Sequence, residues 1–144
     1  MIDNFIALVS RFKFERGPAF VLTCDTATLH WLENAFLALG DGESQAPIVV
    51  GNGSPISSDE RCHLVVEIAR GGRVAEIRQL DRSRFCWSIE PKNIEAITGK
   101  LRLLRISEVA GHQYLEVERG SFRTVVITKG EYTADIIREM RDGS

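Results

Sequence analysis

The sequence is poor in residues that form disulfides or bind metals, with three cysteines and three histidines among its 144 residues. Cys24, Cys62 and Cys86 are odd in number and far apart, which is typical of reduced thiols and not of a disulfide framework. None of these cysteines and histidines has a partner at the CxxC or HxxxH spacing of zinc ligands. We therefore expect free thiols, no metal site and no cofactor.

The sequence also lacks a long apolar run and a strong excess of either charge. Its N-terminal apolar stretch is short, and an acidic residue but no lysine or arginine precedes it. We expect neither a signal peptide nor a membrane span, and hence a cytoplasmic protein without a membrane partner. The formal net charge is −2, whereas proteins that bind nucleic acids mainly through phosphates usually have a basic excess.

Motifs of covalent catalysis and of phosphate binding are missing as well. There is no GxSxG motif, and no serine or cysteine stands in a recognisable strand-to-helix turn near a histidine. Residues 51–53 have the GxG pattern of a phosphate loop, but the third glycine is missing and Pro55 interrupts the path. We interpret this segment as an Asn-Gly turn and predict no catalytic residues, although an enzyme whose site is assembled across the fold stays an open alternative.

The residues that are present suffice for one folded domain. Hydrophobic residues make up 44% of the chain and charged residues 26%, and the length falls in the commonest range for a single domain. We expect residues 1–144 to form one domain, with strand–helix units at about 5–40 and 62–104. A C-terminal hairpin and a short helix are expected within residues 112–142.

Apolar runs bounded by Gly, Pro and Asp predict the strands of a sheet. These strands cover residues 5–14, 18–24, 48–50, 62–69, 72–80, 83–89, 112–118 and 122–128. Turn signals predict hairpins between successive strands, for example at Arg16-Gly17-Pro18, at Arg70-Gly71-Gly72 and around Arg119-Gly120. Residues 41–60 contain most of the turn formers and predict a long loop that includes the short strand Ile48–Val50.

A repeat at an offset of 65 residues is the most informative pattern. At this offset the strand at 20–25 aligns with 85–90, and one helical stripe aligns with a second: Leu29, Leu32, Phe36 and Leu39 with Ile94, Ile97, Leu101 and Leu104. An acidic residue, Asp25 or Glu90, lies between strand and helix in each copy, and a carboxylate such as that of Asp25 can accept amide hydrogens of a first helical turn. The pattern predicts two similar units that share one core. Because Gly99 interrupts the second helix, residues 100–106 are either helix or another strand.

Together these patterns predict an α+β fold with two layers. We expect an antiparallel sheet of six or more strands with two or three helices on one face. The third helix would be a short one at Glu131–Arg141.

One charged cluster is a candidate functional surface. Five arginines fall within 15 residues, at positions 70, 73, 78, 82 and 84. Alternation turns Phe85 and Trp87 toward the helices and Arg84 outward, where a guanidinium can bind a carboxylate or a phosphate. The candidate partner-binding residues are Arg84, Arg82, Arg78, His63 and Tyr114. The alternative is a solvated sheet face without a partner.

Residues His63 to Leu104 resemble PUR-type repeats, which bind single-stranded nucleic acids and combine strands, a Gly-containing turn and a final helix. The resemblance implies a nucleic-acid-binding module as an alternative function. By elimination, the sequence favours a small non-enzymatic protein that binds another protein or itself, of the toxin-neutralising or accessory type. An enzyme of unassigned reaction is the third hypothesis, and the sequence indicates neither the partner nor the oligomeric state.

Overall fold

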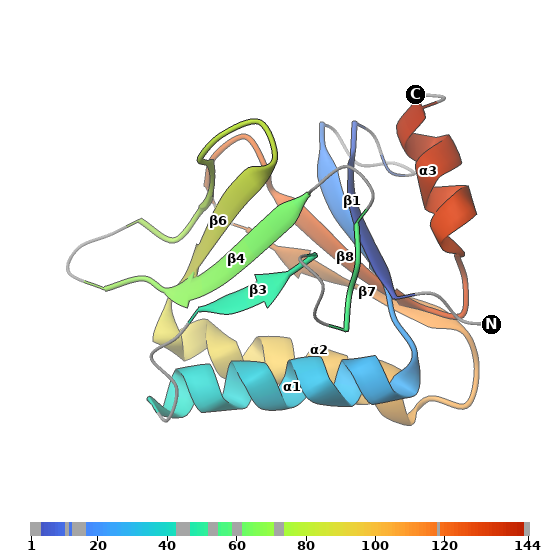
Figure 1. Ribbon diagram of the computed structural model, residues 1–144. Helices are drawn as coiled ribbons and strands as arrows, with labels where there is room; N and C mark the ends of the chain where they lie inside the picture. The colour runs from blue at the N-terminus through green and yellow to red at the C-terminus, as the bar shows by residue number, and fades with distance from the viewer. Residues whose placement is uncertain are drawn as a thin grey trace.

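The computed structural model describes residues 4–10, 12, 17–42, 47–51, 55–58, 62–70, 74–117 and 119–142. Within these ranges the chain forms two four-stranded sheets, with two long helices side by side across one end of them (Figure 1). The strands are β1 (Phe5–Val9), β2 (Ala19–Thr23), β3 (Ile48–Val50), β4 (His63–Ile68), β5 (Ile77–Gln79), β6 (Arg84–Ile89), β7 (Gly111–Glu116) and β8 (Thr124–Lys129). The helices are α1 (Thr26–Asp41), α2 (Ile94–Ile106) and α3 (Ala134–Asp142), and a short 3-10 helix, η1 (Pro91–Asn93), leads into α2.

Both sheets are mixed. The first sheet has the strand order β1-β2-β8-β7, and the second sheet has the order β3-β4-β6-β5. In each, the two central strands are parallel and the outer pairs are antiparallel. The α+β class is confirmed, but the prediction of one antiparallel sheet of six or more strands is wrong. Local turn signals indicate hairpins and carry no information on parallel pairing between residues as distant as Ala19 and Thr124.

Several local predictions can be compared directly with the described residues. The antiparallel pairs β1–β2, β5–β6 and β7–β8 are confirmed, and so is the short strand β3. The hairpin between residues 62–69 and 72–80 is wrong, because β4 pairs with β3 and β6 and not with β5. Arg16, Asn52, Gly53 and Gly71 to Arg73, which belong to other predicted turns and to the arginine cluster, lie outside the described residues.

A side-chain cap fixes the start of α1. Asp25 accepts a hydrogen bond from the Thr28 backbone N–H at 2.8 Å and another from Asn4 Nδ2 at 3.2 Å. Burial alone would raise the pKa of Asp25, but these hydrogen bonds outweigh it and hold the pKa below its usual value. The second helix, α2, continues through Gly99 to Ile106, so residues 100–106 are helical and the alternative strand does not form.

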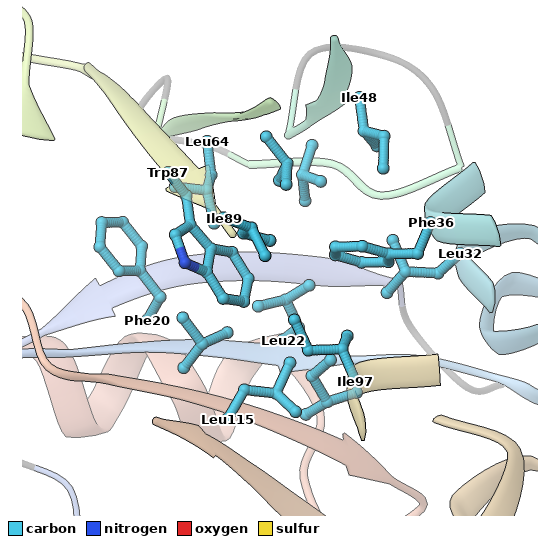
Figure 2. Packing of buried hydrophobic residues seen from close by; sticks show 14 of the residues in the cluster. Phe20, Leu22, Leu32, Phe36, Ile48, Leu64, Trp87, Ile89, Ile97 and Leu115 are labelled. Carbon is cyan, nitrogen blue, oxygen red and sulfur yellow. The ribbon is translucent and has the colours of Figure 1, made fainter. Parts of the chain in front are cut away.

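The core lies between the two sheets and the pair α1–α2. The two inner faces meet through Phe20 and Phe85, whose ring centroids are 5.0 Å apart, and Phe36 of α1 contacts Trp87 edge to face at 6.1 Å. Figure 2 shows Trp87 and Phe36 among the aliphatic side chains of both sheets and both helices. The apolar stripes of the two helices, represented by Leu32 and Ile97, therefore pack into the same core.

A second, smaller cluster covers the outer face of the first sheet. The helix α3 packs there beside β1 (Figure 1), and Ile137 of α3 is fully buried in a cluster with Phe12, Val21 and Val126. Of the three described helices, two thus lie on the core side and α3 lies on the opposite face of the first sheet. None of the described helices is long and apolar enough to cross a membrane. No helix covers the outer face of the second sheet in the described part of the chain (Figure 1).

Candidate functional surfaces

The structure brings three of the five predicted site residues together on the outer face of the second sheet. His63 of β4 is paired in register with Arg84 of β6, and Arg78 of β5 is opposite Cys86, two residues further along β6. Because paired residues point to the same side of a sheet, His63, Arg84 and Arg78 share this outer face. Arg82 is exposed in the turn before β6, where it lines a cavity of about 160 Å³ with Ser58 and other residues.

Arg84 and Arg78 each lie close to a carboxylate of the same chain. Arg84 Nε lies 2.6 Å from Asp81 Oδ2, and Asp81 also accepts hydrogen bonds from the backbone of Ser83 and Arg84. The bond from Ser83, together with the Arg84 guanidinium, holds the pKa of Asp81 below its usual value. Arg78 Nη2 lies 3.9 Å from Glu67 Oε1. A phosphate or carboxylate from a partner would have to compete with these carboxylates.

The centre of this face is covered, which differs from the open arrangement that alternation predicts. Cys86 and Ser88 point outward but are only 4% and 1% exposed. Both donate hydrogen bonds to Glu67 Oε1 at 3.3 Å. Burial, and then the bond to Glu67, raise the pKa of the Cys86 thiol, while burial raises the pKa of Cys24 to about 12. These two thiols are therefore protonated near neutral pH and are poor nucleophiles.

Tyr114 does not belong to the arginine face. It lies on β7 of the first sheet, and its ring contacts Phe12 at 6.3 Å and His112 at 5.2 Å between centroids. The sequence grouped it with Arg84 because both were expected on one sheet. In the described residues, no three His, Cys, Asp or Glu side chains lie close enough together to hold a metal ion.

A surface that the sequence reasoning missed runs along the outer side of α2. Its exposed apolar positions recur at intervals of three and four residues, and we call them the α2 stripe: Ala96, Gly99, Leu103 and Ile106. Leu103 and Ile106 are each 60% exposed, and Val109, just beyond the helix, is 71% exposed. The signal was present in the sequence as a second apolar stripe opposite the buried one, but the uncertain helix end at Gly99 hid it.

The charged groups on both sides of the α2 stripe form hydrogen bonds with other parts of the chain. Glu33 of α1 is 3% exposed and accepts hydrogen bonds from Arg102 Nε at 3.2 Å and Arg105 Nε at 2.9 Å. Burial alone would raise the pKa of Glu33, but the two guanidinium groups, Arg105 foremost, lower it. On the other side, Lys100 Nζ donates to the backbone oxygen of Tyr114 at 2.7 Å. The stripe therefore lies between cations that are held by internal partners.

Gly99 is unusual because no described residue packs closely enough to require a glycine there. Among the described residues, a Cβ atom at Gly99 would have no neighbour within 4 Å, whereas one at Gly40 of α1 would lie 2.8 Å from Ile94 Cγ2. Close packing of α1 on α2 thus explains Gly40. A glycine in a helix interior costs about 1 kcal/mol of stability relative to alanine. No packing contact of a described residue offsets this cost at Gly99.

A cleft of about 180 Å³ opens beside the α2 stripe, between α2, β6 and the edge of β7. Asn93, Ala96 and Lys100 line its α2 side, and Trp87 forms part of its base. Trp87 is 4% exposed and also contacts Phe36 of α1 edge to face (Figure 2).

Comparisons with protein-family models, with curated proteins and with solved structures found no match to this chain. The functional argument therefore depends on the geometry and chemistry of these surfaces.

Proposed function

We propose that this chain is a non-enzymatic accessory protein that acts by binding another protein through the α2 stripe. The observation that supports it is that Leu103 and Ile106, about one turn apart on the outer side of α2, are each 60% exposed. Contiguous apolar surface of this kind, bordered by polar residues, is typical of protein-binding sites. The class includes toxin-neutralising proteins, which act by covering the surface of a partner.

A partner that covers the α2 stripe would gain free energy from the burial of its apolar side chains. Full burial of a Leu or Ile side chain contributes roughly 1.5–3 kcal/mol, so covering the exposed parts of Leu103 and Ile106 would contribute about 1–2 kcal/mol each. Because Arg102, Arg105 and Lys100 already have partners, a protein docked on the stripe would not leave these charges newly unpaired.

The chemistry of the other surfaces favours this proposal over its two rivals. For a nucleic-acid-binding role, the outer face of the second sheet lacks an aromatic side chain among its described residues, and its arginines Arg84 and Arg78 are near Asp81 and Glu67. For a catalytic role, the thiols of Cys24 and Cys86 have raised pKa values, which disfavours nucleophilic catalysis.

The two halves of the chain are, we further propose, copies of one ββαββ unit. The elements β1-β2-α1-β3-β4 and β5-β6-α2-β7-β8 follow the same order, and each parallel pair joins one strand from each half. At the 65-residue offset, the stripe positions Ala96, Gly99, Leu103 and Ile106 of α2 match Trp31, Asn34, Ala38 and Asp41 of α1. On this proposal the large exposed side chains Leu103 and Ile106 have no counterpart of similar size and polarity in α1.

A site-specific photo-crosslinking experiment tests the binding proposal in the native cell. The photoreactive residue p-benzoyl-phenylalanine replaces Leu103 in one variant and Leu80 in the matched control. Leu80 is also an exposed leucine, but it precedes β6 at the end of the sheet away from the helices (Figure 1). We expect a covalent protein adduct from position 103 and none from position 80. No adduct from position 103, equal adducts from both positions, or an adduct that nuclease removes would contradict the proposal.

A further inference from the structure

We propose that the partner on the α2 stripe is a second copy of this chain, whose own stripe packs against the first in the antiparallel direction. This inference rests on the proposed function and specifies the protein that the stripe binds. It is carried by two features of α2: the order of small and large residues along the stripe, and a glycine that the packing of the described residues does not explain.

The α2 stripe is complementary to itself in one register. Its N-terminal half is small, with Ala96 and Gly99, and its C-terminal half is large, with Leu103 and Ile106. In an antiparallel pair related by a two-fold axis, Ala96 faces Ile106 of the other copy and Gly99 faces Leu103. Each pair sums to 202 in residue number, so a single register satisfies both. A parallel pair would instead place large residues against large ones and leave the small ones apart.

Gly99 has a role in this arrangement that the single chain does not give it. Its missing side chain leaves open space on the outer side of α2, since a Cβ atom there meets nothing within 4 Å. Leu103 of the second copy, which is 60% exposed in the single chain, can fill that space. Small residues at helix interfaces permit the backbones to approach closely, which is the role that Gly40 already has between α1 and α2.

The cations beside the stripe have internal partners. In this register Lys100 of one copy lies at the level of Arg102 of the other, since these numbers also sum to 202. Arg102 pairs with the buried Glu33, which reduces the repulsion among these cations, and Lys100 donates to the backbone oxygen of Tyr114. Two-fold dimers, in which both copies use the same surface, are the commonest oligomers. A self-complementary stripe is therefore expected to form a closed two-fold dimer.

Sedimentation velocity with four proteins tests the inference. Wild type should have twice the mass of one chain. Leu103→Asp places a charge in the interface, and Gly99→Leu fills the space that receives the partner, so both should have the mass of one chain. Leu80→Asp, the matched control, should stay dimeric. Circular dichroism checks that each variant is folded, and Gly99→Leu is expected to fold because position 99 is exposed and a Cβ atom there meets no described neighbour within 4 Å.

Two outcomes separate this inference from the proposed function. A monomeric wild type whose position 103 crosslinks to a different protein would overturn the second copy as partner and would leave the protein-binding function standing. A wild-type dimer that survives both Leu103→Asp and Gly99→Leu would overturn the use of the α2 stripe. If position 103 also yields no adduct, the proposed function is contradicted as well.

Discussion

Replacing two glycines by alanine should change stability in opposite directions. Gly99→Ala removes the conformational penalty of a glycine in the interior of α2, and the new methyl group has no neighbour within 4 Å. Alanine is favoured over glycine in a helix by about 1 kcal/mol, so the free energy of unfolding should rise by about 0.5–1 kcal/mol. For a domain of this size the melting temperature should rise by about 2–4 °C.

Gly40→Ala should instead destabilise the chain. Its Cβ atom would lie 2.8 Å from Ile94 Cγ2 and 3.3 Å from Ile94 Cβ, and Ile94 is buried at the α1–α2 contact. Overpacking of this kind costs typically about 1–3 kcal/mol, which exceeds the gain in helix propensity.

The assay is urea denaturation followed by circular dichroism, at a protein concentration low enough that the single chain is measured. The slope of the transition should be the same for both variants and the wild type, so that the midpoints report stability alone. A midpoint that falls for Gly99→Ala, or rises for Gly40→Ala, would refute the reasoning about which glycine the fold requires.

Three further predictions concern the core and the Glu33 cluster. Leu32→Ala and Ile97→Ala should each lower the free energy of unfolding by about 2–5 kcal/mol, because both remove large side chains from one shared core. A loss of less than about 1 kcal/mol at either position would contradict the burial of that residue in the core. Glu33→Gln should cost about 1–3 kcal/mol at neutral pH through the loss of its charged hydrogen bonds to Arg102 and Arg105. Because the folded pKa of Glu33 lies below the unfolded value of about 4.3, its contribution is present above that pH and is lost as the pH falls through the folded pKa. The difference in stability between wild type and Glu33→Gln should therefore shrink on acidification, and a difference that grows would contradict the assigned pKa shift.

The local parts of the fold could be predicted because they depend on nearby residues. The stripe that begins at Leu29, the cap at Asp25 and the short strand Ile48–Val50 follow from periodicity and side-chain chemistry within a few positions. The pairing of β2 with β8 could not be predicted in this way. Apolar alternation says which face of a strand is buried, but it does not say which distant strand lies beside it.

The candidate site was predictable to a similar extent. Alternation correctly placed Arg84 on the outer face and Trp87 in the core. It could not indicate that Glu67 folds over Cys86, because that contact depends on the parallel pairing of β4 with β6. The α2 stripe could not be recognised from the sequence because Gly99 locally disfavours a helix. The helix continues past Gly99 because Leu101 and Leu104 pack into the core and stabilise it.

Cysteine crosslinking between chains tests the antiparallel dimer most directly. The native cysteines Cys24, Cys62 and Cys86 are buried, so a cysteine introduced on the α2 stripe can be oxidised selectively. A mixture of Ala96→Cys and Ile106→Cys chains should form a disulfide-linked dimer. Either variant alone should not, because two copies of position 96 are separated by about 15 Å along the helix axis in this register. Crosslinking of the mixture alone is the predicted result, and crosslinking of each single variant, or of neither sample, would contradict the account.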